Sequence, residues 1–363
     1  MASSEHKSAK KYQRVYELDL LRLFAAASVM LYHYTFRGFA ADSMSVLAFP
    51  ALGEVFRYGY LGVGLFFMIS GFVIIHTLEG KDARSLIASR AARLYPAYWA
   101  GVTLTAVVTV LIGGSIYKVS AGQYLANLTM LNGLFGVEHI DGVYWSLLVE
   151  LKFYFLIFLL MVFGQAKRIG LFVGLWALAA FAITVYGSPF LVKALLFPKW
   201  APYFIAGAAF CLMRREGAGA YWLVVVAIAY VTAITNELRK IPSIEQHYGA
   251  VFSEPAIIAV VTSFFLIFTA IALRKSSWAG AKGLVKLGAL TYPLYLIHEN
   301  IGFMAFNALA PYLNKYIILA SAIAVMWLAA YLTNRYVEER LGGRLKRAVV
   351  SVLSVGRRTA ARD

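Results

Sequence analysis

Apolar runs of about 20 residues recur along the whole chain, and each is long enough for a helix to cross a bilayer core of roughly 30 Å. Of the 363 residues, 61% are hydrophobic and only 14% are charged. A soluble domain would carry about a quarter charged residues, and a membrane β-barrel would show alternating segments of about ten residues. The sequence therefore predicts an all-α fold, a polytopic transmembrane helix bundle.

We predict ten membrane spans, near 17–36, 58–78, 95–116, 143–163, 169–187, 199–213, 219–236, 252–273, 286–309 and 316–335. With the N-terminus in the cytoplasm, 24 of the 34 Lys and Arg residues fall on the inner side, eight fall outside and two lie within spans. This asymmetry follows the positive-inside rule, so we expect both termini in the cytoplasm and a multi-pass protein of the inner membrane. The net charge of +16 then reflects topology and contact with anionic lipid, and nucleic acid is not expected as a partner.

The organisation that follows is one membrane domain, 17–337, between basic cytoplasmic tails at 1–16 and 338–363. The second tail is partly amphipathic and is expected on the inner leaflet, with a solvated topogenic tail as the simpler alternative. A single cysteine, Cys211, excludes a disulfide framework or a cysteine-based metal site within one chain. No metal site is expected. Polar residues within spans cluster in the first four, so we expect the chemistry in the N-terminal half and a scaffold in the later helices.

The first span, "DLLRLFAAASVMLYHY", carries three ionisable residues where charge is costly. Arg22 and His33 are eleven positions apart, so on a helix they project from one face, about 16 Å apart along the axis. Asp19 precedes Arg22 by three positions and can pair with it. In the expected topology Arg22 lies in the inner half and His33 near the outer end, which would mark the two ends of a transmembrane path. The alternative is an Asp19–Arg22 anchor at the inner interface and a hydrogen-bonded structural histidine.

The fourth span, "VYWSLLVELKFYF", places Glu150 about seven residues from its outer end, at a depth expected to match His33. A carboxylate that faces an imidazole can hold its tautomer and stabilise the imidazolium. The alternative is an intrahelical pair with a lysine, although Lys152 is two positions away and faces elsewhere.

Three further places carry polar residues that could serve chemistry. Glycines of the second span are expected to allow close helix packing, and Ser70 there either lines the path or bonds its own backbone. The inner loop 80–94 carries Arg90 and Arg93, whose spacing lets both grip phosphate unless they are plain inside-positive charge. The ninth span carries His298 and Glu299 near mid-membrane. Buried ionisable residues there suggest function, and a structural polar contact is the alternative.

Taken in order, five stretches resemble the acyltransferase 3 family of integral membrane O-acyltransferases. They are "LDLLRLFAAASVMLYHY", "GYLGVGLFFMISGFVI", "RAARLYPAYW", "YWSLLVELKFYF" and "LTYPLYLIH", and the resemblance covers about 17–335. The chain departs from the family pattern at Leu21, where glycine is frequent. It also departs at Glu299-Asn300, where a less polar residue and then proline are common, and this second departure leaves the role of His298 open.

The resemblance implies transfer of an acyl group, usually acetyl, from coenzyme A to a hydroxyl of a bacterial envelope sugar. Acetyl-CoA would be a substrate, with no tightly bound cofactor, and a carbohydrate or glycolipid would be the acceptor. A positioned base speeds such a transfer by about 10² to 10⁴, and we assign this role to His33, with Glu150 to orient it. Arg22 is assigned both to the catalytic set and to the donor. The other predicted site residues are Arg90, Arg93 and Ser70 for the donor, and Asp19, Trp145, Tyr154 and His298 along the substrate path.

Two other classes of protein stay open at this point. A transporter or flippase for a lipid-linked sugar also needs a polar path through a helix bundle, although transporters often show repeats with interrupted helices, which this sequence lacks. A purely structural membrane subunit does not need an arginine and a histidine aligned on one face. Within the acyltransferase interpretation, direct transfer and a transient acyl group on His33 both remain open.

Overall fold

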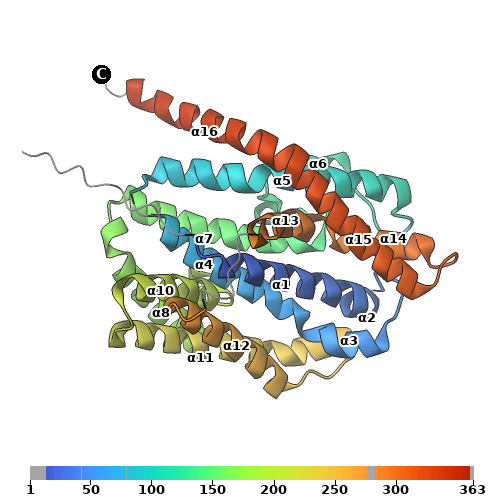
Figure 1. Cartoon of the computed structure of the whole chain (residues 1–363), viewed down its shortest axis with the longest axis horizontal. Helices are drawn as coiled ribbons and strands as arrows, with labels where there is room; N and C mark the ends of the chain where they lie inside the picture. Colours follow the sequence, from blue (N-terminus) through green and yellow to red (C-terminus); the bar gives the residue numbers. More distant parts are fainter. Residues whose placement is uncertain (1–13, 42, 79, 277–282, 360–363) are drawn as a thin grey trace, which may run out of the picture.

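The computed structural model describes residues 14–41, 43–78, 80–276 and 283–359. In these ranges the backbone forms helices joined by turns and short loops, without a strand. The helices pack into a single bundle (Figure 1), which confirms the predicted all-α class. In chain order they are α1 (Glu17–Tyr32), η1 (His33–Arg37), α2 (Gly38–Ala40), α3 (Pro50–Phe56), η2 (Arg57–Leu61), α4 (Gly62–Leu78), α5 (Ala83–Ile112), α6 (Ala121–Asn127), η3 (Asn132–Phe135), η4 (Gly142–Tyr144), α7 (Trp145–Val162), η5 (Ala166–Arg168), α8 (Ile169–Tyr186), α9 (Phe190–Leu196), α10 (Ala201–Glu216), α11 (Ala220–Tyr248), α12 (Glu254–Ala272), α13 (Leu284–Ile297), α14 (Glu299–Leu309), α15 (Lys315–Thr333), η7 (Asn334–Glu338) and α16 (Glu339–Thr359).

The described residues include eight helical stretches that are long and apolar enough to cross a membrane, by length and composition. They are Pro50–Leu78, Ala83–Ile112, Gly142–Val162, Ala166–Tyr186, Phe190–Glu216, Ala220–Tyr248, Glu254–Ala272 and Lys315–Ser354. The other two predicted spans are also helical: 17–36 falls on α1 and η1, and 286–309 falls on α13 and α14. The chain is therefore a multi-pass membrane protein.

Two helices extend well beyond the apolar runs that predicted them. The region 80–94 was expected to be a loop, but α5 begins at Ala83, where the Asp82 carboxylate accepts a hydrogen bond from the Ser85 amide at 2.8 Å. Similarly, α11 continues to Tyr248, twelve residues past its predicted end. Hydropathy detects only the part of a helix that lipid surrounds, so it misses polar turns at either end. These extra turns carry residues of both cavities described below.

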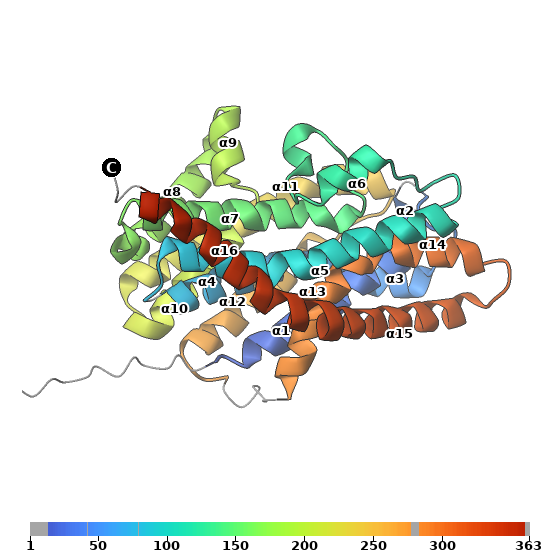
Figure 2. The same cartoon turned by 90° about the horizontal axis from the view of Figure 1, so that it is seen from above.

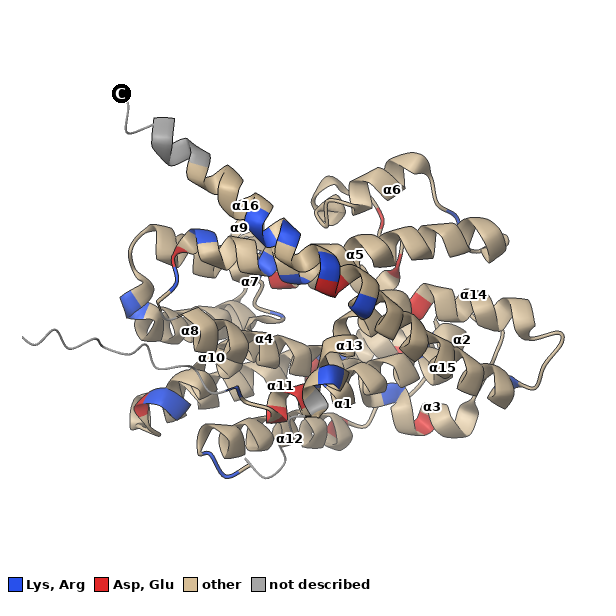
Figure 3. Ribbon diagram, turned by 45° about the horizontal axis from the view of Figure 1, so that its top comes forward, with Lys and Arg blue, Asp and Glu red and all other residues tan. Residues whose placement is uncertain are grey.

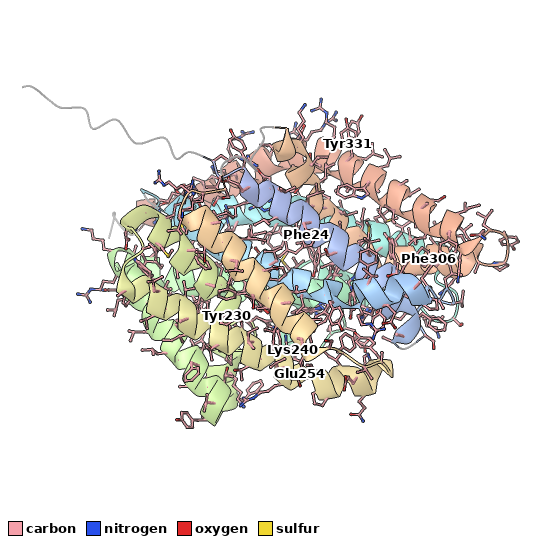
Figure 4. The ribbon with its side chains drawn as sticks, turned by 60° about the horizontal axis from the view of Figure 1, so that its bottom comes forward. Phe24, Tyr230, Lys240, Glu254, Phe306 and Tyr331 are labelled. Carbon is pink, nitrogen blue, oxygen red and sulfur yellow. The ribbon has the colours of Figure 1, made fainter. Side chains whose placement is uncertain are left out.

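Helices α1 and α4 pack against each other, with α13 against α1 and α10 against α4 (Figure 1). The contact between α4 and α10 is close because Gly71 has no side chain: a Cβ there would lie 2.2 Å from the Phe204 carbonyl oxygen. Large apolar side chains instead cover the outside, for example Phe24 and Tyr331, which are 58% and 50% exposed (Figure 4). Such an outer surface suits contact with lipid chains.

The C-terminal helix α16 lies against α5 (Figure 1 and Figure 2). Lys and Arg recur along it (Figure 3), and it follows α15 and η7 without a break. Its expected place on the inner leaflet stays a prediction. Of the predicted basic tails, residues 1–13 and 360–363 lie outside the described residues.

Candidate active site

Helix α1 connects two cavities in the bundle. Arg22, near its beginning, lines the first, and His33, directly after its end, lines the second. The helix continues through a π-helical turn, η1, which carries both His33 and Arg37 into the second cavity. Such turns are uncommon and occur frequently at functional sites. We call the two the inner and the outer cavity, after the sides of the membrane expected for them.

The inner cavity has a volume of about 110 Å³. All four residues predicted for the donor line it, and so do two residues predicted for other roles. These six are Arg22, Ser70, Arg90, Arg93, Glu150 and Tyr154. Three guanidinium groups against one carboxylate give this cavity a positive surface that suits a polyanion.

The three arginines are held in different ways. Arg22 donates to Asp19 at 2.9 Å, and Arg14 also donates to that buried carboxylate. Arg93 pairs with Glu338 at 3.1 Å. Arg90 lies over the Tyr154 ring at 5.8 Å, and its buried Nε finds no hydrogen-bond partner among the described residues. Buried donors are rarely left unpaired, so Arg90 can take an anionic ligand.

Glu150 does not face His33, which corrects the predicted pairing. Its Oε1 accepts hydrogen bonds from Ser70 at 2.6 Å and from Tyr154. Trp145, at the start of the same helix, lines the outer cavity. Glu150 follows Trp145 by five residues, which is a rise of about 7.5 Å along the helix. This rise is enough for the two side chains of α7 to line different cavities. Counting residues from the end of a span placed Glu150 too close to the outer side.

The outer cavity is larger, about 490 Å³. Its lining residues come from α1, η1, η2, α4, η4, α7, the residues just before α10, and α11, α13 and α14. Those used below are Tyr32, His33, Arg37, Tyr60, Val63, Trp145, Lys199, Trp200, Arg239, Lys240, Tyr248, Tyr295 and Glu299. Val63 and Tyr295 line both cavities, so the two meet at these side chains.

The protonation of His33 follows from its partner, His298. His298 Nδ1 lies 2.9 Å from the Tyr295 carbonyl oxygen, which can only accept, so Nδ1 carries the hydrogen. His298 Nε2 is then an acceptor, and His33 Nδ1, at 2.8 Å, donates to it. This assignment rests on the hydrogen-bond network. It leaves the Nε2 of a neutral His33 with a free lone pair, which is what a general base requires.

Glu299 takes the position that was expected for Glu150. Its Oε1 lies 3.7 Å from His33 Nε2 and also pairs with Arg37. Its side chain is 1% exposed, and a buried carboxylate needs such a partner. If His33 gains a proton, this carboxylate stabilises the imidazolium while His298 still accepts from Nδ1. Beside it, burial raises the pKa of the Asp141 carboxyl, and the nearby Glu299 charge adds to this effect.

Gly142 allows the Glu299 carboxylate to lie close to the η4 turn. A Cβ at this position would lie 2.7 Å from Glu299 Oε2, too near for either group to stay in place. We expect Gly142→Ala to move the carboxylate away from His33 and to lower acyl-transfer activity about tenfold, since small misplacements in a site are costly. The assay is the turnover rate in proteoliposomes, with thermal unfolding to verify folding.

Gly122→Ala is the matched control, because a Cβ at Gly122 on α6 would meet nothing within 4 Å. Full activity in Gly142→Ala would mean that the position of the Glu299 carboxylate is unimportant.

Most residues predicted for the site line one of the two cavities, but the side chains contact one another in different pairs from those predicted. Asp19 lies behind Arg22 and holds it, whereas Tyr154 lines the inner cavity and Trp145 the outer one. His298 contacts His33 directly. The missing members were Arg37 and Glu299. Glu299 did stand out as an acidic residue in an apolar span, but nothing in the sequence joined it to His33, 266 positions earlier.

Within residues 14–41, 43–78, 80–276 and 283–359, no group of three or more His, Cys, Asp or Glu side chains is placed to hold a metal ion. The outer cavity does hold an imidazole, His33, with the Glu299 carboxylate beside it.

Comparison with known proteins identifies the kind of domain. The chain matches the family described as "Acyltransferase domain" over residues 15–334. No solved structure matches it.

Three curated proteins are similar to the chain. Nodulation protein 10 of Rhizobium leguminosarum bv. viciae is 30% identical over 219 residues, which cover 52% of this chain and 57% of that protein. Acyltransferase MdmB of Streptomyces mycarofaciens is 24% identical over 314 residues, 78% of each chain. Peptidoglycan O-acetyltransferase OatA of Listeria monocytogenes is 24% identical over 210 residues, 50% of this chain and 31% of that protein. The match thus spans little more than half of the nodulation protein and less than a third of the Listeria protein.

Proposed function

The chain belongs to the acyltransferase 3 family, and from this premise we propose that it transfers an acetyl group from acetyl-CoA to a sugar hydroxyl at the cell surface. Membership of the family makes the chain an acyltransferase and decides against the transporter that the sequence left open. The donor, the acceptor and the residues that act on them are the subject of the proposal.

The inner cavity is the proposed donor site. Coenzyme A carries several phosphate charges, and guanidinium groups bind phosphate in a planar, two-pronged geometry. Arg22, Arg90 and Arg93 line this cavity, and the unpartnered Nε of Arg90 supports an anionic ligand there. Ser70 and Tyr154 both donate to Glu150, so we assign Glu150 to position this wall of the cavity.

The outer cavity is the proposed site of chemistry. A sugar hydroxyl is a weak nucleophile at neutral pH, and His33 Nε2 would take its proton as the oxygen attacks the thioester carbonyl. The thiolate of coenzyme A leaves and recovers a proton from the imidazolium. His298 orients the ring through His33 Nδ1, and Glu299 stabilises its charged form. The acetyl group passes directly to the acceptor in this scheme.

The acceptor class rests on the relatives. One of them is named for O-acetylation of peptidoglycan, a glycan on the outer side of the membrane. A sugar hydroxyl in the outer cavity fits this class, because Trp145 and Trp200 lie there with ring centroids 5.0 Å apart. Aromatic rings offer apolar faces on which a sugar ring can lie.

The observation that carries the proposal is the junction of the two cavities at Val63 and Tyr295. A donor held by the arginines can extend its pantetheine arm past these side chains toward His33. The test uses purified protein in proteoliposomes with acetyl-CoA labelled on the acetyl group. Glycolipids extracted from membranes of the source organism serve as acceptors. We expect base-labile label in the glycolipid fraction and an equal release of coenzyme A thiol. Donor binding without any transfer of label would contradict the proposal.

A variant at the junction tests the passage itself. Val63 is 8% exposed, and Val63→Phe would add a ring where the cavities meet. We expect the turnover rate to fall about 10²-fold, because the thioester no longer reaches its attack position, while the Kd for acetyl-CoA stays the same. Isothermal titration and the transfer assay measure the two quantities.

Val63→Ala is the control, since it widens the passage and should leave the turnover rate intact. An unchanged rate in Val63→Phe would mean that the acyl group travels by another route.

A further inference from the structure

Several Lys and Arg side chains line the outer cavity, on the side of the membrane where such residues are usually few. Lys and Arg are normally depleted from the outer side, and this chain places only eight there in the expected topology. Four of these eight line the outer cavity: Arg37, Lys199, Arg239 and Lys240. Lys240 lies on the long helix α11 (Figure 4), and residues of the last turns of this helix line the outer cavity.

The carboxylates nearby do not balance these charges. Arg37 is matched by Glu299, the one carboxylate among the described residues that line the cavity. Lys240 pairs with Glu237 at 2.7 Å, but Glu237 is buried behind the wall and also accepts from Tyr203. Lys199 and Arg239 are exposed, and Arg239 donates to the Thr184 carbonyl oxygen. The lining therefore carries more positive than negative charge, on the side formed by α11 and the residues before α10.

Two other features of the same cavity suit a ligand. Lys199 and Lys240 both lie over the Trp200 ring, with Nζ 5.4 Å and 4.0 Å from its centroid, so positive charge and an aromatic face occur together. The Tyr60 hydroxyl is buried and has no hydrogen-bond partner among the described residues. A buried hydroxyl without a partner is costly, and a ligand in the cavity would satisfy it.

We propose that the acceptor carries an anionic group, a carboxylate or a phosphate, which Lys199, Arg239 and Lys240 bind while its reacting hydroxyl faces His33. This inference rests on the proposed function and adds the charge of its substrate. We call these three residues the cation wall. The cation wall then selects acidic glycans or phosphate-linked sugars over neutral sugars, because a neutral sugar makes no ionic contact with it.

The first test measures the charge of the natural product and does not require that the product be identified. Membranes of the source organism containing the overproduced protein receive labelled acetyl-CoA, and the labelled glycan is separated on an anion exchanger. We expect the label to be retained. Neutralising carboxylates with a carbodiimide releases it if the group is a carboxylate, and mild acid or phosphatase releases it if the group is a phosphate. A labelled product that passes through uncharged overturns the inference and leaves the proposed function intact. A complete lack of protein-dependent label contradicts both.

The second test measures whether the cation wall binds the anionic group of the acceptor. Lys199→Ala with Arg239→Ala removes two exposed cations, so folding should persist. We expect the apparent KM for the anionic acceptor fraction to rise about tenfold, the turnover rate at saturation and the Kd for acetyl-CoA to stay the same, and the salt dependence of KM to weaken.

Lys193→Ala is the matched control, an exposed cation on α9 at the edge of the bundle that does not line the cavity (Figure 2). Lys240→Gln is a second variant, since glutamine still donates to Glu237, and it should raise KM in the same way. An unchanged KM in both the double variant and Lys240→Gln overturns the inference.

Discussion

His33→Ala is expected to lower acyl transfer by about 10² to 10⁴, the contribution of a positioned general base, while acetyl-CoA still binds. The two effects separate because His33 and the arginines line different cavities, about 16 Å apart along α1 by helix geometry. His33→Gln should be equally inactive, because an amide can hydrogen-bond to His298 but cannot take a proton. Transfer rate and donor Kd, measured on the same proteoliposome preparation, test both expectations.

The control for His33 is His298→Asn. An amide oxygen at this position can still accept a hydrogen bond near His33, so activity should fall less than in His33→Ala. The rate should also keep a pH dependence set by His33. A fully active His33→Ala variant would return the residue to the structural role that the sequence left open, a hydrogen-bonded histidine between α1 and α13.

Arg90→Ala combined with Arg93→Ala should remove donor binding. A hydrogen bond to a charged group contributes about 1.5–3 kcal/mol, so the loss of two corresponds to a Kd for acetyl-CoA raised by about 10² to 10⁴. Arg90 has the larger expected share, since its Nε has no partner in the described structure, whereas Arg93 is already paired with Glu338. Titration of acetyl-CoA in detergent or in nanodiscs measures the change.

Arg84→Ala with Arg340→Ala is the matched control, two arginines on α5 and α16 that do not line the inner cavity. It removes the same formal charge near the same helices. If donor affinity stayed the same in Arg90→Ala/Arg93→Ala, both residues would be plain inside-positive charge, the alternative that the sequence left open for them.

The features that depend on one helix could be predicted from the sequence. The spacing of Arg22 and His33 on α1 put them on one face, and the structure places them in two cavities along that helix. The positions of the spans followed in the same way, because the length of an apolar run is a local property.

The features that depend on which helices meet could not be predicted. His33 contacts His298 and Glu299 from the break between α13 and α14, and no periodicity within either segment reveals this pairing. The expectation that the chemistry belongs to the N-terminal half was therefore wrong for the surroundings of His33. The cation wall was missed for a related reason: α11 extends past its apolar run, and its polar last turns were read as a connection.

The proposed function joins a cytosolic thioester to an extracytoplasmic sugar, so a protein that performs it must not become a pore that discharges the ion gradients of the cell. The meeting of the cavities at Val63 and Tyr295 bears on this requirement. The Tyr295 hydroxyl bonds with Ser146 at 2.8 Å, and Phe66 packs edge-on against its ring at 5.7 Å. Water and ions that enter from either side therefore meet a layer of tethered side chains. We therefore expect the unliganded protein to conduct no ions, and the donor arm to displace the Tyr295 ring when it passes.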